Sequence, residues 1–191
     1  MGDFENSWIK DLSSSEPSIR TDAATQIYAA GRTRADRAIY EWWSNHDFAQ
    51  LFGPKPVATV GLAVTPETFA RIREANGSPR LAEVPTTQDA SEFELHFTPE
   101  ISLDILTTRS PEGAGAIARF LSKYGEGVQQ VEFRCYNVDR ATQLLRESFG
   151  VQPVYPSMQP GADGTRINFF LVAGADGKKV LVELYEPELP G

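Results

Sequence analysis

The stretch GEGVQQVEFRC, residues 125–135, alternates apolar side chains with side chains that can do chemistry. Residues two apart in a β-strand point to the same face, so this stretch would have one apolar and one polar face. The polar set consists of Gln130, Glu132 and Arg134. An amide, a carboxylate and a guanidinium in one row can orient a polar ligand, balance its charge or take part in proton transfer. We expect this face to line a binding cleft, although a solvated outer face would show the same alternation.

The same alternation in other segments extends the polar set. The helices should cover the apolar residues, which leaves the alternate residues of each strand on the cleft side. At 166–172 this parity selects Asn168, together with Arg166 and Phe170. The candidate ligand-binding residues are Thr59, His96, Gln130, Glu132, Arg134 and Asn168, and the candidate catalytic residues for proton transfer are Glu183 and Glu94.

One order of elements, a strand followed by a helix and three strands, occurs twice along the chain and would position these residues. The first pass predicts strands at 57–64, 81–84, 92–97 and 101–107, with a helix at 66–75; the second predicts strands at 128–135, 152–155, 166–172 and 179–185, with a helix at 138–149. A helix capped by Ser110, with Pro111 at its first position, is expected to connect them. The predicted fold class is therefore α+β, with two βαβββ modules forming a cleft-shaped mixed sheet and an N-terminal helical hairpin.

The N-terminal hairpin is predicted from the helical spacing of residues 1–52. Gly31 would end a first helix, and a second would span 33–44. Trp42 and Trp43 are expected to pack against the rest of the chain, because an isolated helix pair has too little core to stand alone. The hairpin would form a cap, followed by a main domain at 56–191 with modules at about 56–108 and 126–187.

Bulk properties exclude several functional classes. The chain has 191 residues and a net charge of −8, and phosphate binding requires a concentrated basic surface, so we expect no nucleic-acid partner. One cysteine, Cys135, excludes an internal disulfide framework and is expected to be a buried thiol. Neither a signal peptide nor a membrane-spanning stretch is predicted. We expect a cytoplasmic protein with a small-molecule ligand and no membrane partner; a homodimer stays open.

Several stretches carry a family resemblance. GEGVQQVEF, NVDRATQLLRE, GADGTRINFF and KKVLVELYE resemble the vicinal oxygen chelate superfamily, which includes the glyoxalase, bleomycin-resistance and dioxygenase families. Within it they resemble methylmalonyl-CoA epimerase most closely, and VATVGLAV and RLAEVP fit its first module more loosely. The resemblance implies two βαβββ modules whose sheets form a cleft, with a metal on the inner face.

The resemblance also implies a set of metal ligands, one from the first and one from the last strand of each module. Carried across to this chain, these positions fall on Thr59, Asp104, Gln130 and Glu183. Thr59 and Gln130 stand where histidines are implied, whereas Asp104 and Glu183 keep acidic character. Where the epimerases carry a catalytic glutamate this chain has Thr86, which cannot act as a base.

Such an oxygen-only set suits Mg²⁺, Mn²⁺ or Ca²⁺ better than Zn²⁺, Ni²⁺ or Co²⁺, unless His96 joins it. A metal held by Asp104 and Glu183 is one alternative. The other is a site without a cofactor, in which Gln130 hydrogen-bonds directly to one of these carboxylates.

Two functions follow. One is a glyoxalase-like protein that binds a small polar or acyl ligand in its cleft without the usual metal centre. The alternative is a divalent-metal-dependent isomerase or lyase that resembles methylmalonyl-CoA epimerase and uses Glu183 or Glu94 for proton transfer next to a carbonyl. The missing histidines favour the first, and the retained acidic residues Asp104 and Glu183 favour the second. The sequence leaves open whether the protein is an enzyme.

Overall fold

The computed structural model describes residues 2–52, 58–174 and 179–187. The chain forms two compact units: unit 1 contains residues 1–30 and 59–129, and unit 2 contains residues 31–58 and 130–191. Each unit is described by itself. The expected first strand began at residue 57, and that residue and the linker residues 53–56 lie outside the described residues.

The N-terminal helices are α1 (Gly2–Asp11) and α2 (Pro17–Trp43). The prediction that Gly31 ends a helix is wrong, because α2 continues through it. A glycine inside a helix costs about 1 kcal/mol relative to alanine. Here Gly31 falls on a buried stripe with Ile27 and Ala35, at helical spacing, so packing on both sides of the glycine outweighs its low propensity. The helix α1 was not predicted.

In unit 1, strand β3 (Ile101–Thr107) pairs antiparallel with β2 (Ser91–Thr98) and parallel with β1 (Ala58–Ala63), which gives a mixed sheet. Helix α4 (Pro66–Ala75) follows β1 and is capped by Thr65. The predicted strand at 81–84 does not form; only Ala82 N–H donates to the Glu92 carbonyl, at 3.0 Å.

The connecting helix is shorter than expected. Helix α5 (Ala116–Tyr124) begins after Gly115, so Ser110 is not its cap. Ser110 instead opens a turn in which its carbonyl accepts a 2.8 Å hydrogen bond from Gly113 N–H. The two glycines at 113 and 115 favour this turn over a longer helix, because glycine loses the most backbone freedom in a helix.

The strands of unit 2 pair in both directions. Strand β4 (Gly127–Arg134) pairs parallel with β7 (Lys179–Glu186), which pairs antiparallel with β6 (Arg166–Ala173), which in turn pairs with the short β5 (Gln159–Pro160). Helix α6 (Val138–Phe149) is capped by Asn137. A 3₁₀ turn, η2 (Ala162–Gly164), precedes β6.

The predicted strand at 152–155 reduces to one isolated bridge between Pro153 and Phe170. Proline has no N–H for a ladder, and Pro153 and Pro156 flank this segment, so a regular strand cannot form. The other predicted strands and the helices at 66–75 and 138–149 are confirmed to within a few residues.

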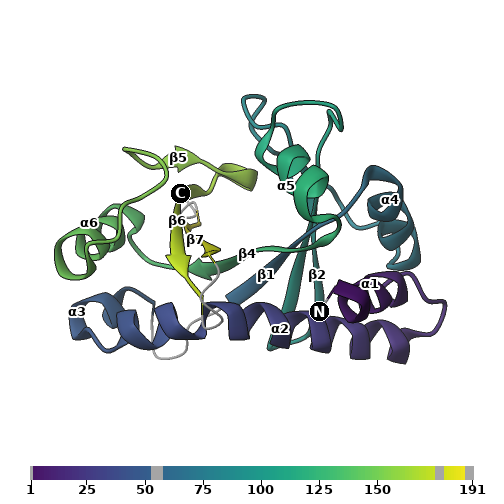
Figure 1. Ribbon diagram of the computed structural model, residues 1–191, viewed down its shortest axis with the longest axis horizontal. Helices are drawn as coiled ribbons and strands as arrows, with labels where there is room; N and C mark the ends of the chain where they lie inside the picture. The colour runs from purple at the N-terminus through teal and green to yellow at the C-terminus, as the bar shows by residue number, and fades with distance from the viewer. Residues whose placement is uncertain (1, 53–57, 175–178, 188–191) are drawn as a thin grey trace. The chain divides into compact units, whose positions relative to one another are not determined.

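The core of unit 1 lies between one sheet face and the helices α1, α2 and α4. Ile9 of α1 and Leu12, just after this helix, are buried with Ile27 of α2 and with Phe69 and Ile72 of α4. Figure 1 shows these helices gathered beside β1 and β2. The opposite face of the sheet is left for polar residues.

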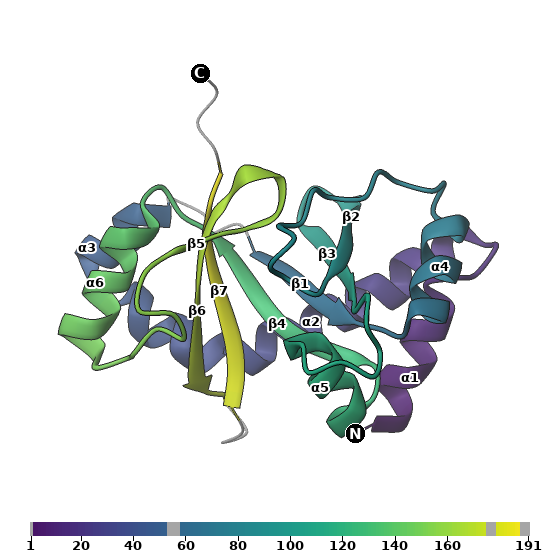
Figure 2. The same ribbon diagram turned by 90° about the horizontal axis from the view of Figure 1, so that it is seen from above.

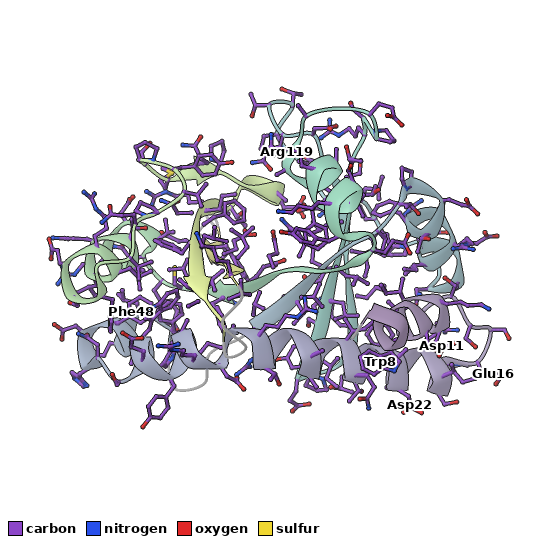
Figure 3. All side chains as sticks on the ribbon, in the orientation of Figure 1. Trp8, Asp11, Glu16, Asp22, Phe48 and Arg119 are labelled. Carbon is purple, nitrogen blue, oxygen red and sulfur yellow. The ribbon has the colours of Figure 1, made fainter. Side chains whose placement is uncertain are left out.

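The core of unit 2 lies on the sheet face that α6 covers, as Figure 2 shows. Trp42 is 1% exposed, and its ring packs edge-on against Phe48 and Phe170. Phe48, labelled in Figure 3, belongs to α3 (His46–Ala49), which is followed by the 3₁₀ turn η1 (Gln50–Phe52). Its ring also packs edge-on against Phe149 of α6. The expectation that Trp42 packs against the strands is confirmed. Whether residues 1–52 are a separable cap stays a prediction.

Candidate functional site

The strand register of unit 2 brings Gln130, Glu132 and Glu183 together. Glu132 of β4 and Glu183 of β7 are register partners, so their side chains point to the same face of the sheet. This is the face opposite α6, and we call it the site face of unit 2. Its residues are Gln130, Glu132, Arg134, Ile167, Phe169, Leu171, Leu181, Glu183 and Tyr185.

The amide of Gln130 bridges the two carboxylates. Its Nε2 donates to Glu183 Oε2 at 2.7 Å and to Glu132 Oε1 at 3.1 Å. Gln130 and Glu132 are buried, at 6% and 8% exposure, whereas Glu183 is partly exposed. An amide nitrogen carries two protons, so one donor group can serve both acceptors. The prediction that Gln130 lies within reach of Glu183 is confirmed; its distance to Asp104, which belongs to unit 1, stays a prediction.

One charged residue expected on this face lies elsewhere. Arg166 was expected on the cleft side, but it points to the α6 side, where it bonds to Asp139 and, at 3.2 Å, to Glu186. Glu132 receives the Gln130 amide. Arg134 is exposed at the end of β4, opposite Tyr185 in the register.

The predicted orientation of Asn168 is wrong. Asn168 is the register partner of Leu184 and Phe170 that of Val182, and both partners lie on the α6-covered face. Asn168 is 1% exposed, and its amide donates to the Tyr155 carbonyl at 3.3 Å, so it holds the loop against β6. Both alternating sets in RINFFLV contain apolar residues, so parity had no clear signal in this segment.

The structure places Phe169 where Asn168 was expected. Phe169 is the register partner of Glu183, and the Tyr155 ring meets it edge-on with centroids 6.1 Å apart. Ile167 and Leu171 flank Phe169 on the same face. The site face of unit 2 therefore joins a carboxylate–amide centre to an aromatic and aliphatic edge. No motif in the sequence indicated this edge.

The site face of unit 1 carries the other candidate residues. Asp104 of β3 is the register partner of Glu94 of β2 and of Gly61 of β1, and His96 is that of Ser102. Thr59 shares this face by its parity with Gly61. The predicted orientation of Thr59, Glu94, His96 and Asp104 toward one face is confirmed.

Hydrogen bonds link these residues in a row. Thr59 Oγ1 donates to Glu94 Oε1 at 3.4 Å, His96 Nε2 lies 3.5 Å from Glu94 Oε2, and His96 Nδ1 is 2.8 Å from Ser102 Oγ. The imidazole thus contacts a carboxylate through one nitrogen and a hydroxyl through the other. Such an arrangement fixes the orientation of the imidazole ring.

Helix α5 closes one end of this face. Leu106, two residues beyond Asp104 on β3, is buried with Ala63 of β1 and Ile117 of α5. Phe120 and Val84 pack against the same cluster. The polar part of the face is therefore the stretch that holds Thr59, Glu94, His96 and Asp104.

The residues implied as metal ligands fit a transition metal poorly. Thr59 and Gln130 offer oxygen donors where imidazoles are implied, and Gln130 directs a proton-bearing nitrogen at Glu183. A cation beside Glu183 would have to displace that nitrogen. Within residues 2–52, 58–174 and 179–187, no group of three or more His, Cys, Asp or Glu side chains is arranged to hold a metal ion.

Cys135 directly follows β4 and lies on the core side of the sheet. It is 1% exposed, and burial raises the pKa of its thiol from 9.0 to about 12, with a smaller contribution from the negative charge of Glu186. A thiol that stays protonated is a poor nucleophile. The expectation of a buried core thiol is confirmed.

Comparison with known proteins shows which of them share the fold of this chain. No family model and no curated protein matches the chain, but solved structures do. Methylmalonyl-CoA epimerase from Mycobacterium tuberculosis aligns with a TM-score of 0.55 and 29% identity, over 69% of this chain and 87% of the epimerase. This chain has the fold of the methylmalonyl-CoA epimerases.

Two further structures share the epimerase fold. A variant epimerase from Streptomyces coelicolor in complex with 2-nitronate-propionyl-CoA aligns with a TM-score of 0.55 and 22% identity, over 71% of this chain and 99% of that one. A hypothetical protein from Bacillus halodurans aligns with a TM-score of 0.56 and 25% identity, over 70% and 94%. The predicted resemblance and the α+β fold class are confirmed. No helix among the described residues is both long and apolar enough to cross a membrane.

Proposed function

We propose that this chain binds an acyl thioester on its epimerase fold and does so without a transition metal. The observation that carries the proposal is the Gln130 amide, which donates to Glu183 at 2.7 Å from the position where the resemblance implies a metal-ligating histidine. A neutral donor at this position satisfies the carboxylate that a metal would otherwise neutralise.

The ligand class follows from the neighbours of the fold. Solved epimerases of this fold hold methylmalonyl-CoA or 2-nitronate-propionyl-CoA. In this chain the acyl end of such a ligand would lie against the site face of unit 2. Glu183 is the partly exposed acceptor there, and Arg134 is the exposed cation of the same face, suited to an anionic group of the ligand.

The proposal is tested by calorimetric titration of propionyl-CoA into protein dialysed against EDTA. We expect saturable binding that is unchanged when Mg²⁺, Zn²⁺ or Co²⁺ is added back. Arg134→Ala should weaken binding, whereas Arg140→Ala, which removes an exposed arginine from α6, should not. Binding that appears only with added metal would overturn the proposal.

The second candidate is a divalent-metal-dependent isomerase or lyase, in which Glu183 or Glu94 removes a proton next to the thioester carbonyl, with Mg²⁺, Mn²⁺ or Ca²⁺ as the metal. The partial exposure of Glu183, in contrast to the burial of Glu132, favours it, because a catalytic base must reach its substrate. Exchange of the α-hydrogens of propionyl-CoA in D₂O, followed by NMR, tests this candidate. Exchange that Glu183→Gln abolishes would support it, and no exchange with or without these metals would exclude it.

A further inference from the structure

We infer that the acyl group accepted by this site is uncharged and apolar, and that Phe169 and Tyr155 select it. The inference rests on the proposed function, since it concerns the acyl end of the same thioester ligand. Two independent features of the site face of unit 2 carry it: the aromatic and aliphatic edge on β6, and the charges beside that edge.

The edge lies directly beside the proposed centre of binding. Phe169 is opposite Glu183 in the β6–β7 register, and Ile167 and Leu171 are its neighbours on the same face of β6. A group bound at Glu183 can therefore extend from the carboxylate onto the Phe169 ring without leaving the face.

Tyr155 completes the edge and is held in place by the backbone. Phe169 O accepts a 2.7 Å hydrogen bond from Val154 N–H, and Tyr155 O accepts one of 3.3 Å from the buried amide of Asn168. These bonds set the Tyr155 ring against Phe169, with centroids 6.1 Å apart. Asn168 is thus a positioning residue for the aromatic pair.

The edge is more apolar and more exposed than a solvated strand requires. Leu171 is 49% exposed and Tyr155 is 40% exposed. Neighbouring exposed apolar side chains next to a polar centre are typical of a ligand site, in which the apolar part fixes affinity and the polar part fixes orientation.

The charges beside the edge disfavour an acidic acyl group. Glu132 and Glu183 place two carboxylates opposite each other on this face, and Arg134 lies two residues further along β4, opposite Tyr185. A malonyl-type carboxylate bound beside Glu183 would lie next to two acidic side chains that already share one amide donor, which disfavours its negative charge. An alkyl chain on Phe169 avoids this repulsion.

The experiment measures affinities for three probes by calorimetry: propionyl-CoA, hexanoyl-CoA and methylmalonyl-CoA. We expect the wild-type protein to bind hexanoyl-CoA about tenfold or more tightly than propionyl-CoA, since apolar contacts discriminate by such factors for each methylene or two. Methylmalonyl-CoA should bind more weakly than propionyl-CoA. Phe169→Ala and Tyr155→Ala should each weaken binding of hexanoyl-CoA more than binding of propionyl-CoA, and so remove most of the preference for hexanoyl-CoA.

Two controls keep the experiment falsifiable. Tyr40 is 83% exposed on α2, so Tyr40→Ala removes an aromatic ring elsewhere and should leave all three affinities unchanged. Phe169→Leu keeps an apolar side chain and should restore part of the preference if Phe169→Ala proves unstable by circular dichroism.

The outcomes separate this inference from the proposed function. Binding of propionyl-CoA with equal or tighter binding of methylmalonyl-CoA would overturn the inference and leave the proposed function standing. An equal loss of affinity for all three probes, seen in both Phe169→Ala and Phe169→Leu, would also overturn it. Failure of the wild-type protein to bind any of the probes would overturn both.

Discussion

The Gln130 amide of β4 donates a 2.7 Å hydrogen bond to the Glu183 carboxylate of β7, across 53 residues of sequence. The parallel pairing of these strands, which sets Glu132 opposite Glu183, brings the amide between two carboxylates. One neutral side chain therefore organises the acidic part of the site face of unit 2.

Replacing Gln130 by leucine should abolish acyl-CoA binding and leave the fold intact. Both carboxylates lose their shared donor, and an unsatisfied buried polar group costs about 1–3 kcal/mol, so the free energy of unfolding should fall by this order. Calorimetric titration and chemical denaturation measure the two effects. Gln143→Leu, on the exposed side of α6, is the control. Wild-type affinity in Gln130→Leu would remove Gln130 from the site.

Replacing Gln130 by histidine should create a zinc site. The new imidazole would lie beside Glu132 and Glu183, which supply the two carboxylates, and Zn²⁺ accepts such mixed nitrogen and oxygen ligands. We expect tight Zn²⁺ binding by Gln130→His and none of comparable strength by the wild-type protein, measured by competition with a chromogenic chelator. Equal zinc affinity in both proteins would show that residue 130 does not control metal binding.

Replacing Trp42 by alanine should lower the free energy of unfolding by about 3–5 kcal/mol, the usual cost of removing a large buried aromatic side chain. Trp42 is 1% exposed and contacts both Phe48 and Phe170, so its loss opens a cavity in the core of unit 2. Tyr40→Ala on the same helix should stay within about 0.5 kcal/mol of wild type, as exposed positions usually do. Similar losses in both variants would contradict the packing role of Trp42.

The buried thiol of Cys135 should make the folded protein less stable at alkaline pH. Burial raises the pKa of this thiol from 9.0 to about 12, so the folded state keeps the proton while the unfolded state releases it. The contribution of the thiol is fully present below pH 9 and is lost as the pH rises from about 9 to about 12, at roughly 1 kcal/mol per pH unit. Urea denaturation over this range should show a shallower decline in Cys135→Ala. Identical slopes in the two proteins would show that the thiol does not titrate differently on folding.

Much of the architecture could be predicted from the sequence, because local patterns of residues indicate strands with one apolar face and helices with clear caps. The pair of Gln130 and Glu183 was predictable from the family resemblance, which implies both positions as ligands of one site. Gly31 was misread because its role depends on the buried stripe that runs through α2, which propensity alone does not show.

The aromatic edge of the site escaped prediction for a different reason. Strand β6 is apolar on both faces, so alternation could not tell Asn168 from Phe169 as the residue that lies beside Glu183. The pairing of Arg166 with Asp139 and Glu186 was likewise hidden, since it follows from how α6 lies on the sheet.

Elemental analysis of the protein as purified tests the central claim most directly. If Gln130 takes the place of a metal beside Glu183, the protein should contain far less than one equivalent of zinc, nickel or cobalt, before and after dialysis against EDTA. Close to one equivalent of any of these metals, retained through purification, would contradict the account and would point to His96 as a recruited ligand.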